Sequence, residues 1–369
     1  MIRELERGRA AQQVPVRISG VVTFASPRTS GSFIVDDGDS GVYVATRDAT
    51  SGGLPKPDQN FEGDVRTGMK VEVTGVSAAG GFAPVVIPHR IAYLGDAPLP
   101  PAKPVSVANL ETGRLDCERV RVRGVVQHVE FTDRQIDSVQ MEVAAVGGHF
   151  VAYAMNPEGF DPARLVDAEV DLAGVALSFF NERAELVGAR VQLSGIDDVA
   201  TIRAAPPGPF HAPVVGLHEL LPFSPDGPAL HRRRLGGVVT VCRPGNYFYV
   251  QDGDRAVRVS TRDPAPLVPG DQVEVSGFIE LWQYFAEVRE AVFRKTGSAD
   301  LPEPEVITRE QVLEFQPWLQ RSPNASHLDG KRVALQGRLE KVEETDSAGR
   351  RLTLDCRGHM VFATLANEE

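Results

Sequence analysis

The sequence contains an internal repeat, because residues 20–48 are closely matched by residues 237–263. Each copy begins with Gly-Val-Val-Thr, continues through a short apolar run and an Asp-Gly pair, and ends near Thr-Arg-Asp. Alternating apolar and polar residues predict half-buried strands, and Asp-Gly between two such runs is a strong β-hairpin signal, typical of a type I′ turn. The repeat therefore predicts a duplicated all-β module, a kind of domain that more often binds than catalyses.

The strand pattern around each copy is that of a five-stranded OB barrel. In the first copy a long alternating strand is interrupted by Gly20, a hairpin follows, and two further strands lie between about residues 69 and 94. A long first strand, a hairpin, a gap and two strands are the order of the OB-fold. The gap at residues 49–68 contains two glycines and two prolines close together, which a regular helix would not tolerate.

Weaker copies accompany the two clear ones, so the predicted fold is all-β, with about four tandem five-stranded OB-like barrels arranged as two pairs. Only three strands can be placed in the last copy, which predicts an incomplete barrel and a chain truncated at its C-terminus. The predicted segments are an N-terminal leader at 1–13, barrels at 14–96, 116–196, 229–297 and 331–369, and linkers at 97–115 (proline-rich), 197–228 and 298–330.

Net charge bears on the choice of partner. The chain carries a formal charge of −11, and its one dense basic cluster is His-Arg-Arg-Arg at residues 231–234. Proteins that bind nucleic acid usually present a basic face, because neutralising phosphates supplies most of the affinity. The composition therefore disfavours nucleic acid as a partner, although an acidic chain can still contain a local basic groove.

The sequence contains no motif that predicts catalysis. GxSxG, the phosphate-binding loop, HExxH and CxxC are all absent, and the three cysteines and eight histidines are scattered. Asp-Gly-Asp at residues 37–39 and 252–254 lacks the alternating oxygens and distant Glu of a calcium loop, and hairpin turns explain it better. We therefore expect no enzymatic activity, no cofactor and no metal site.

Aromatic residues near the predicted barrel mouths are candidate ligand contacts. OB-folds usually bind through the face of their second and third strands and the loops beside it, where aromatic rings can stack on bases or sugars. Core filling is the alternative explanation, above all for the two phenylalanines. The predicted ligand-binding residues are Tyr43, Phe82, Arg258, Trp282, Tyr284 and Phe285.

The chain resembles the N-terminal sensor region of large bacterial two-component sensor histidine kinases, in which tandem OB-like repeats precede a membrane span and a kinase core. The resemblance covers nearly the whole chain and is carried by residues 2–5, 15–23, 36–44, 81–85 and 94–100. It implies a periplasmic or other extracytoplasmic position and a homodimer in the full-length protein. The signal sequence, membrane helix and kinase domain would lie outside these residues, since no apolar run here reaches the roughly 18 residues of a membrane span.

The leading functional hypothesis is a non-catalytic ectodomain fragment that senses a small-molecule or protein ligand, with the membrane reached only through flanking segments. The alternatives are a tandem OB-fold nucleic-acid-binding protein and a structural spacer. A continuous positive groove over the second and third strands would favour nucleic acid.

Overall fold

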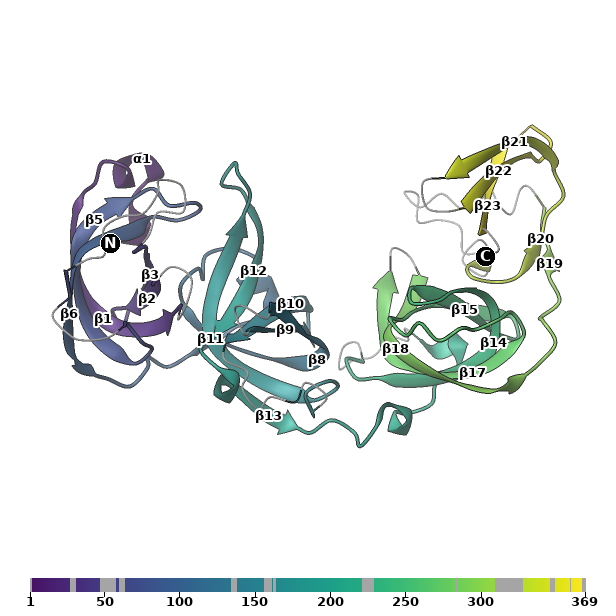
Figure 1. Cartoon of the computed structure of the whole chain (residues 1–369), viewed down its shortest axis with the longest axis horizontal. Coiled ribbons are helices and arrows are strands. Elements are labelled where there is room, and N and C mark those ends of the chain that lie inside the picture. The colour runs from purple at the N-terminus through teal and green to yellow at the C-terminus, as the bar shows by residue number, and fades with distance from the viewer. Residues whose placement is uncertain are drawn as a thin grey trace. The chain divides into compact units, whose positions relative to one another are not determined.

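The computed structural model describes residues 2–26, 31–46, 58–59, 64–133, 138–155, 161, 164–220, 229–282, 285–308, 328–345, 349–358 and 360–366. These residues form mostly β-strands and divide into two compact units, Met1–Pro207 and Gly208–Glu369 (Figure 1). The prediction of an all-β chain of tandem OB-like barrels is thereby confirmed. Among the described residues, no helix is long and apolar enough to cross a membrane.

The first barrel opens the unit Met1–Pro207. Its elements are η1 (Ile2–Glu4), α1 (Arg7–Ala10), β1 (Pro15–Ala25), β2 (Phe33–Asp36), β3 (Gly41–Val44), β4 (Asp58–Gln59), β5 (Met69–Ala78) and β6 (Val85–Asp96). Strand β1 pairs with both β2 and β5, and a parallel contact between β3 and β6 closes the barrel. Buried side chains such as Phe33, Val71 and Ile91 form one core inside it.

In both clear copies the long first strand contains a glycine because no side chain fits there. A Cβ atom on Gly20 would lie 2.3 Å from the carbonyl oxygen of Asp36, and one on Gly237 would lie 2.7 Å from that of Gln251. A β-bulge follows at equivalent places in the two strands and bends them. The glycine noticed in the sequence therefore marks a close approach of two strands.

The Asp-Gly pairs form hairpins, although not type I′ turns. That turn needs positive φ at both central residues. In the connection of residues 37–40 only Gly38 has positive φ, and in the later hairpin Gly253 has it but Asp254 does not. The carboxylate of Asp37 accepts hydrogen bonds from the backbone N–H groups of the two residues that end this connection. These aspartates therefore stabilise turns.

The second barrel completes the unit Met1–Pro207. Its elements are β7 (Lys103–Pro104), α2 (Val107–Leu110), β8 (Arg119–Asp133), β9 (Ser138–Ala145), β10 (Gly148–Met155), β11 (Glu169–Phe180), β12 (Leu186–Leu193), η3 (Ile196–Asp198) and β13 (Val199–Arg203). Pairing of β11 with β8 closes this barrel. Ser106 caps α2, whose two buried residues, Val107 and Leu110, enter the barrel core.

The unit Gly208–Glu369 contains a third barrel, which is closed in the order β14-β15-β16-β18-β17. Its elements are η4 (Pro209–His211), η5 (Leu217–Glu219), β14 (Arg233–Arg243), β15 (Tyr247–Asp252), β16 (Arg255–Ser260), β17 (Asp271–Trp282) and β18 (Phe285–Ser298). The core includes Leu235, Phe248 and Val259, together with Leu217 from η5.

The last strands of this unit form two small sheets. One pairs β19 (Glu305–Val306) with β20 (Val333–Ala334), and the other is an open sheet of β21 (Arg338–Thr345), β22 (Gly349–Asp355) and β23 (Met360–Ala366). Leu339 is 53% exposed, whereas Val239, also two residues after its strand glycine, is fully buried. Within the described part of the chain, no further strand covers the inner face of β21–β23.

Candidate functional site

The outer face of β2 and β3, which OB-folds commonly use for ligands, is covered in the first barrel. Ile34 and Tyr43 pack there against Cys117 and Val175 of the second barrel. The approach is so close that a Cβ atom on Gly41 would lie 1.8 Å from the carbonyl oxygen of Cys117. The structure therefore places Tyr43, a predicted ligand contact, in the junction between two barrels.

Phe82 also lies where the first two barrels meet. Its ring stacks on that of Phe180, with centroids 6.4 Å apart and an interplanar angle of 11°. A Cβ atom on Gly113 would lie 2.8 Å from the end of the Phe82 ring. Of the six predicted contacts, two thus belong to the same junction.

The second barrel carries an arginine clamped between aromatic rings. Arg190 extends from β12, and its guanidinium carbon lies 5.1 Å from the ring centroid of Tyr153 and 4.8 Å from that of Phe179. The hydroxyl of Tyr153 donates to Oε1 of Gln140 across 2.7 Å, which fixes the ring. Rings on both sides stabilise the cation and hold its N–H groups in a defined direction. We call this set, Gln140, Tyr153, Phe179 and Arg190, the arginine face.

The charge of Arg190 is not balanced by a carboxylate in the described part of the chain. Its Nε is buried and has no hydrogen-bond partner among those residues. Burial lowers the pKa of Arg190, while Tyr153 and Tyr43 act in the opposite direction. Because a guanidinium stays protonated in proteins, the site holds a partly desolvated cation. An anion that reaches it would be stabilised by charge-assisted hydrogen bonds.

In the third barrel the equivalent parallel strand pair also carries an arginine, but on the other strand and opposite a glutamate. The parallel pair Val151 and Arg190 in the second barrel corresponds to the pair Arg258 and Glu287 in the third. There Nε of Arg258 lies 3.4 Å from Oε1 of Glu287, and its guanidinium carbon lies 4.5 Å from the ring centroid of Tyr247. In the second barrel the opposing residue is Val151, which cannot neutralise Arg190.

The remaining predicted contacts cluster around the third barrel. Arg258 lies on its β15–β16 face, and Phe285 begins β18 opposite Trp282. The side chain of Trp282 and the whole of Tyr284 lie outside the described residues. Tyr249 on the same face is approached by the loop before β20, since a Cβ atom on Gly330 would lie 2.9 Å from its ring. This face is therefore partly covered and already carries an ion pair.

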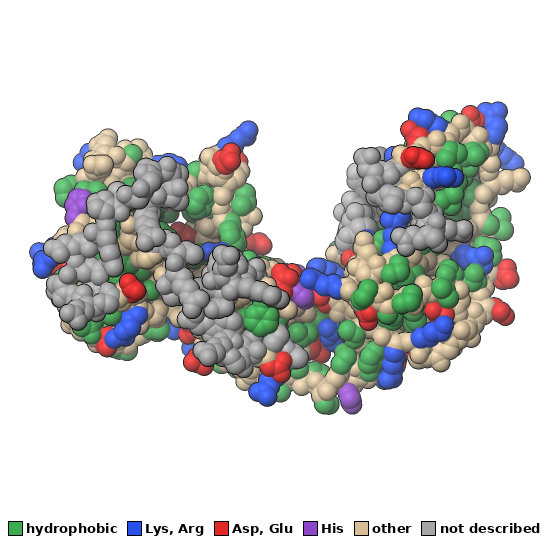
Figure 2. All heavy atoms as spheres, viewed as in Figure 1, with side chains coloured by type: hydrophobic (Ala, Val, Ile, Leu, Met, Phe, Trp, Pro, Cys, Tyr) green, Lys and Arg blue, Asp and Glu red, His purple; other side chains and the backbone are tan. Residues whose placement is uncertain are grey.

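Two arginines of the basic cluster at residues 231–234 make structural contacts within the third barrel. Arg232 is buried, donates to the carbonyl oxygens of Ser276 and Glu290, and lies over the ring of Phe278. Arg234 pairs with Glu274 at 2.9 Å. On the face shown in Figure 2, Lys and Arg side chains are scattered among Asp and Glu. The cluster seen in the sequence is therefore structural, at least at these two arginines.

The described residues contain no group of three or more His, Cys, Asp or Glu side chains placed to hold a metal ion. The arginine face offers hydrogen-bond donors and aromatic surface, and it presents no nucleophile beside a base. Its chemistry is therefore that of binding.

No protein-family model matches the chain, and no curated protein matches it. Among solved structures, the chain is similar to an aspartyl tRNA synthetase from Entamoeba histolytica, with 9% identity over 49% of this chain and 51% of that one, at a TM-score of 0.23. It thus spans about half of the synthetase. A murine DNA-binding protein bound to double-stranded DNA is 12% identical over 50% of this chain and 99% of its own length, with a TM-score of 0.22. The p204 HINb domain is 10% identical over 47% of this chain and 95% of its own length, with a TM-score of 0.20. Likeness this distant carries no argument about function.

Proposed function

We propose that this chain is a non-catalytic binding module and that the arginine face binds single-stranded nucleic acid. The observation that carries the proposal is the guanidinium of Arg190, clamped between Tyr153 and Phe179 without a carboxylate partner among the described residues. It lies beside β9 and β10, the second and third strands of the barrel, where OB-folds bind oligonucleotides.

The exposed ring of Phe179 beside Arg190 supplies an aromatic surface for a base. This side chain is 38% exposed, and its centroid lies 4.8 Å from the guanidinium carbon. A base can stack on such a ring whatever its identity, while a guanidinium fork can bind a phosphate through two N–H groups. The ring of Phe179 can thus take the base of a nucleotide, and the guanidinium of Arg190 can take its phosphate.

Charge limits how much of a strand can be bound. Residues 1–207 contain 20 Lys and Arg against 27 Asp and Glu, so the net charge is 20 − 27 = −7. A long phosphate backbone would be repelled by such a unit. We therefore propose that only one or two phosphates are contacted and that affinity falls weakly with salt, with a logarithmic slope of about −0.7 to −1.4.

Fluorescence anisotropy of a labelled (dT)12 oligonucleotide with the full chain tests this proposal. Replacing Arg190 by Met should weaken binding by roughly tenfold or more, because the phosphate loses its cation. Arg203→Met is the matched control, since Arg203 is an exposed arginine of β13 that pairs with Glu169. Equal affinity of the wild type and Arg190→Met, or equal losses in both variants, would contradict the proposal.

A separate proposal concerns where the module works. We infer from the resemblance of residues 15–23 and 36–44 that it belongs to the extracytoplasmic sensor region of a histidine kinase. Ligand binding by the arginine face does not depend on this placement. The flanking coding sequence tests it, because a membrane helix and a kinase core downstream would support it. A downstream domain of another class would contradict it.

A further inference from the structure

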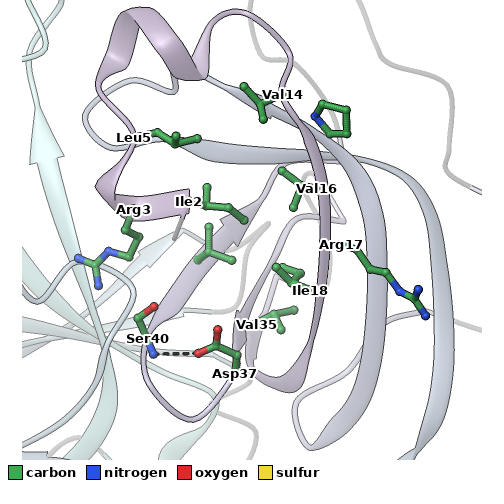
Figure 3. Close-up of a pocket in the computed structure, with 12 residues that line it drawn as sticks. Ile2, Arg3, Leu5, Val14, Val16, Arg17, Ile18, Val35, Asp37 and Ser40 are labelled. Atoms are coloured by element: carbon green, nitrogen blue, oxygen red, sulfur yellow. Dashed lines mark hydrogen bonds between the residues drawn. The ribbon is translucent and has the colours of Figure 1, made fainter.

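The first barrel contains a cavity of about 400 Å³ at one end, beneath the N-terminal segment (Figure 3). The cavity wall is mostly apolar and comes from both sides of the barrel mouth. Its apolar lining consists of Ile2 and Leu5 from the N-terminal segment, Val14, Pro15, Val16 and Ile18 from the start of β1 and the residue before it, and Val35 and Val42 from the hairpin strands. This volume is within the range of ordinary small-molecule sites.

The other two closed barrels are filled at the corresponding end. In the second barrel Val107 and Leu110 of α2 are 1% and 2% exposed and belong to the core. In the third barrel Leu217 of η5 has the same role. Ile2 and Leu5 have the three-residue spacing of Val107 and Leu110, yet both remain only half-buried. The N-terminal segment therefore covers the first barrel with two apolar side chains, as α2 does in the second barrel, but it does not fill the space beneath them.

The two arginines at the edge of the cavity are paired with glutamates. Arg3 lies 2.6 Å from Glu118, and Arg17 lies 2.9 Å from Glu72. Figure 3 shows both arginines directed away from the cavity centre, and it shows Asp37 bonded to the backbone of Ser40. An anionic ligand would have to displace Glu118 or Glu72, and a cationic ligand would have to draw Asp37 from its turn. An uncharged apolar ligand disturbs none of these contacts.

We propose that this cavity binds a compact, uncharged, apolar small molecule. Burial of its surface against the aliphatic wall supplies the driving force. The site is separate from the arginine face and does not rest on the function proposed above.

The N-terminal segment that covers this cavity also contacts residues of the second barrel. Arg3 of η1 contacts Glu118 and also donates to the carbonyl oxygen of Arg114 across 3.0 Å. A ligand beneath Ile2 pushes on the segment that carries this contact. Occupancy should therefore change hydrogen exchange at the start of β8 as well as in β1.

The neutral fluorophore N-phenyl-1-naphthylamine is a suitable probe, with the anionic 8-anilinonaphthalene-1-sulfonate for comparison. Titration into the full chain should give saturable fluorescence enhancement with the neutral probe and a weaker response with the anionic one. Ile18→Phe fills the cavity and should reduce affinity for the neutral probe at least tenfold, whereas Ile202→Phe on exposed β13 should leave it unchanged. Binding of (dT)12 should be unaffected by Ile18→Phe.

Two results would overturn the proposal. One is unchanged probe affinity in Ile18→Phe, and the other is loss of binding in Phe362→Ser, which alters an exposed ring on β23 far along the chain. If Ile18→Phe does not fold by circular dichroism, Val16→Leu serves as a milder filling variant with the same expected direction. Hydrogen exchange with saturating neutral probe should protect β1 amides, and protection confined to β21–β23 would count against the site.

Discussion

Lys331 occupies in the second unit the position that Glu118 occupies in the first, and the partner of each has the opposite charge. Lys103 pairs with Glu118 at 2.8 Å, and Glu305 pairs with Lys331 at 2.5 Å. Both pairs lie beside short parallel contacts, between β7 and β8 and between β19 and β20. The chain thus enters the second barrel and the open sheet β21–β23 through the same local geometry with exchanged charges.

This exchange predicts that the ion pair in the second unit can be reversed with little loss of stability. Glu305→Lys should destabilise the β19–β20 contact by roughly 1–3 kcal/mol, because Lys331 has a side chain only 7% exposed and would face a second cation. Adding Lys331→Glu should restore most of that loss. Hydrogen exchange of the Ile307 amide, which donates to Ala334, measures the effect locally. No recovery in the double variant would contradict the shared geometry.

The contact between Gly41 and Cys117 predicts a strong effect of one methyl group. Gly41→Ala should force the first two barrels apart, with a loss of roughly 1–3 kcal/mol typical of overpacking. Burial raises the pKa of the Cys117 thiol well above its usual value, so the wild-type thiol should react slowly. Alkylation with peptide mapping should therefore show faster modification of Cys117 in Gly41→Ala.

Gly8→Ala is the control for that measurement, because a Cβ atom there meets nothing within 4 Å. If Cys117 reacted at the same rate in Gly41→Ala as in the wild type, the tight junction would be wrong.

Asp36 predicts a pH dependence at the same junction. Burial raises its pKa above the usual 3.8, Glu118 adds to the rise, and the backbone N–H of Gly38 opposes it. The folded state therefore binds this proton more tightly than the unfolded state, so the contribution of Asp36 to stability improves as pH falls through the raised pKa. Asp36→Asn should raise the thermal midpoint at pH 7, and the difference from wild type should shrink as pH falls through the raised pKa toward the usual 3.8. A constant difference across that range would contradict the assignment.

Local features of the sequence predicted most of the fold. The glycines at positions 20 and 237 and the alternating runs around them marked the bent first strands, because these depend on residues near in sequence. The turn type was wrong because Asp254 lacks positive φ in the later hairpin, and because four residues rather than two connect β2 to β3 in the first. The covered position of Tyr43 depends on Cys117 and Val175 in another barrel, and no local pattern contains that information.

The arginine face was missed for a similar reason. Arg190 and Tyr153 come together only through the parallel pairing of β10 with β12, whose register cannot be read from either strand alone. A usable signal was present in Phe179 and Phe180, an adjacent pair of aromatics at the end of a strand. The basic cluster at residues 231–234 is the denser charge signal in the sequence, yet Arg232 is buried in the third barrel.

The comparison of the second and third barrels predicts a substitution that should weaken nucleic-acid binding at the arginine face. Val151→Glu would place a carboxylate opposite Arg190, as Glu287 stands opposite Arg258. It should weaken (dT)12 binding by roughly tenfold, because the phosphate then competes with an internal anion. Val151→Gln has nearly the same shape without the charge and should bind within about threefold of wild type. Equal affinities of these two variants would show that the charge of Arg190 is not used.

The most direct test of the account is the location of bound nucleic acid. Ultraviolet cross-linking of (dT)12 to the full chain, followed by mass spectrometry of the peptides, should place cross-links in residues 138–155 and 169–193, which carry Tyr153, Phe179 and Arg190. These cross-links should be lost in Arg190→Met. Cross-links confined to the third barrel, residues 233–298, would contradict the account.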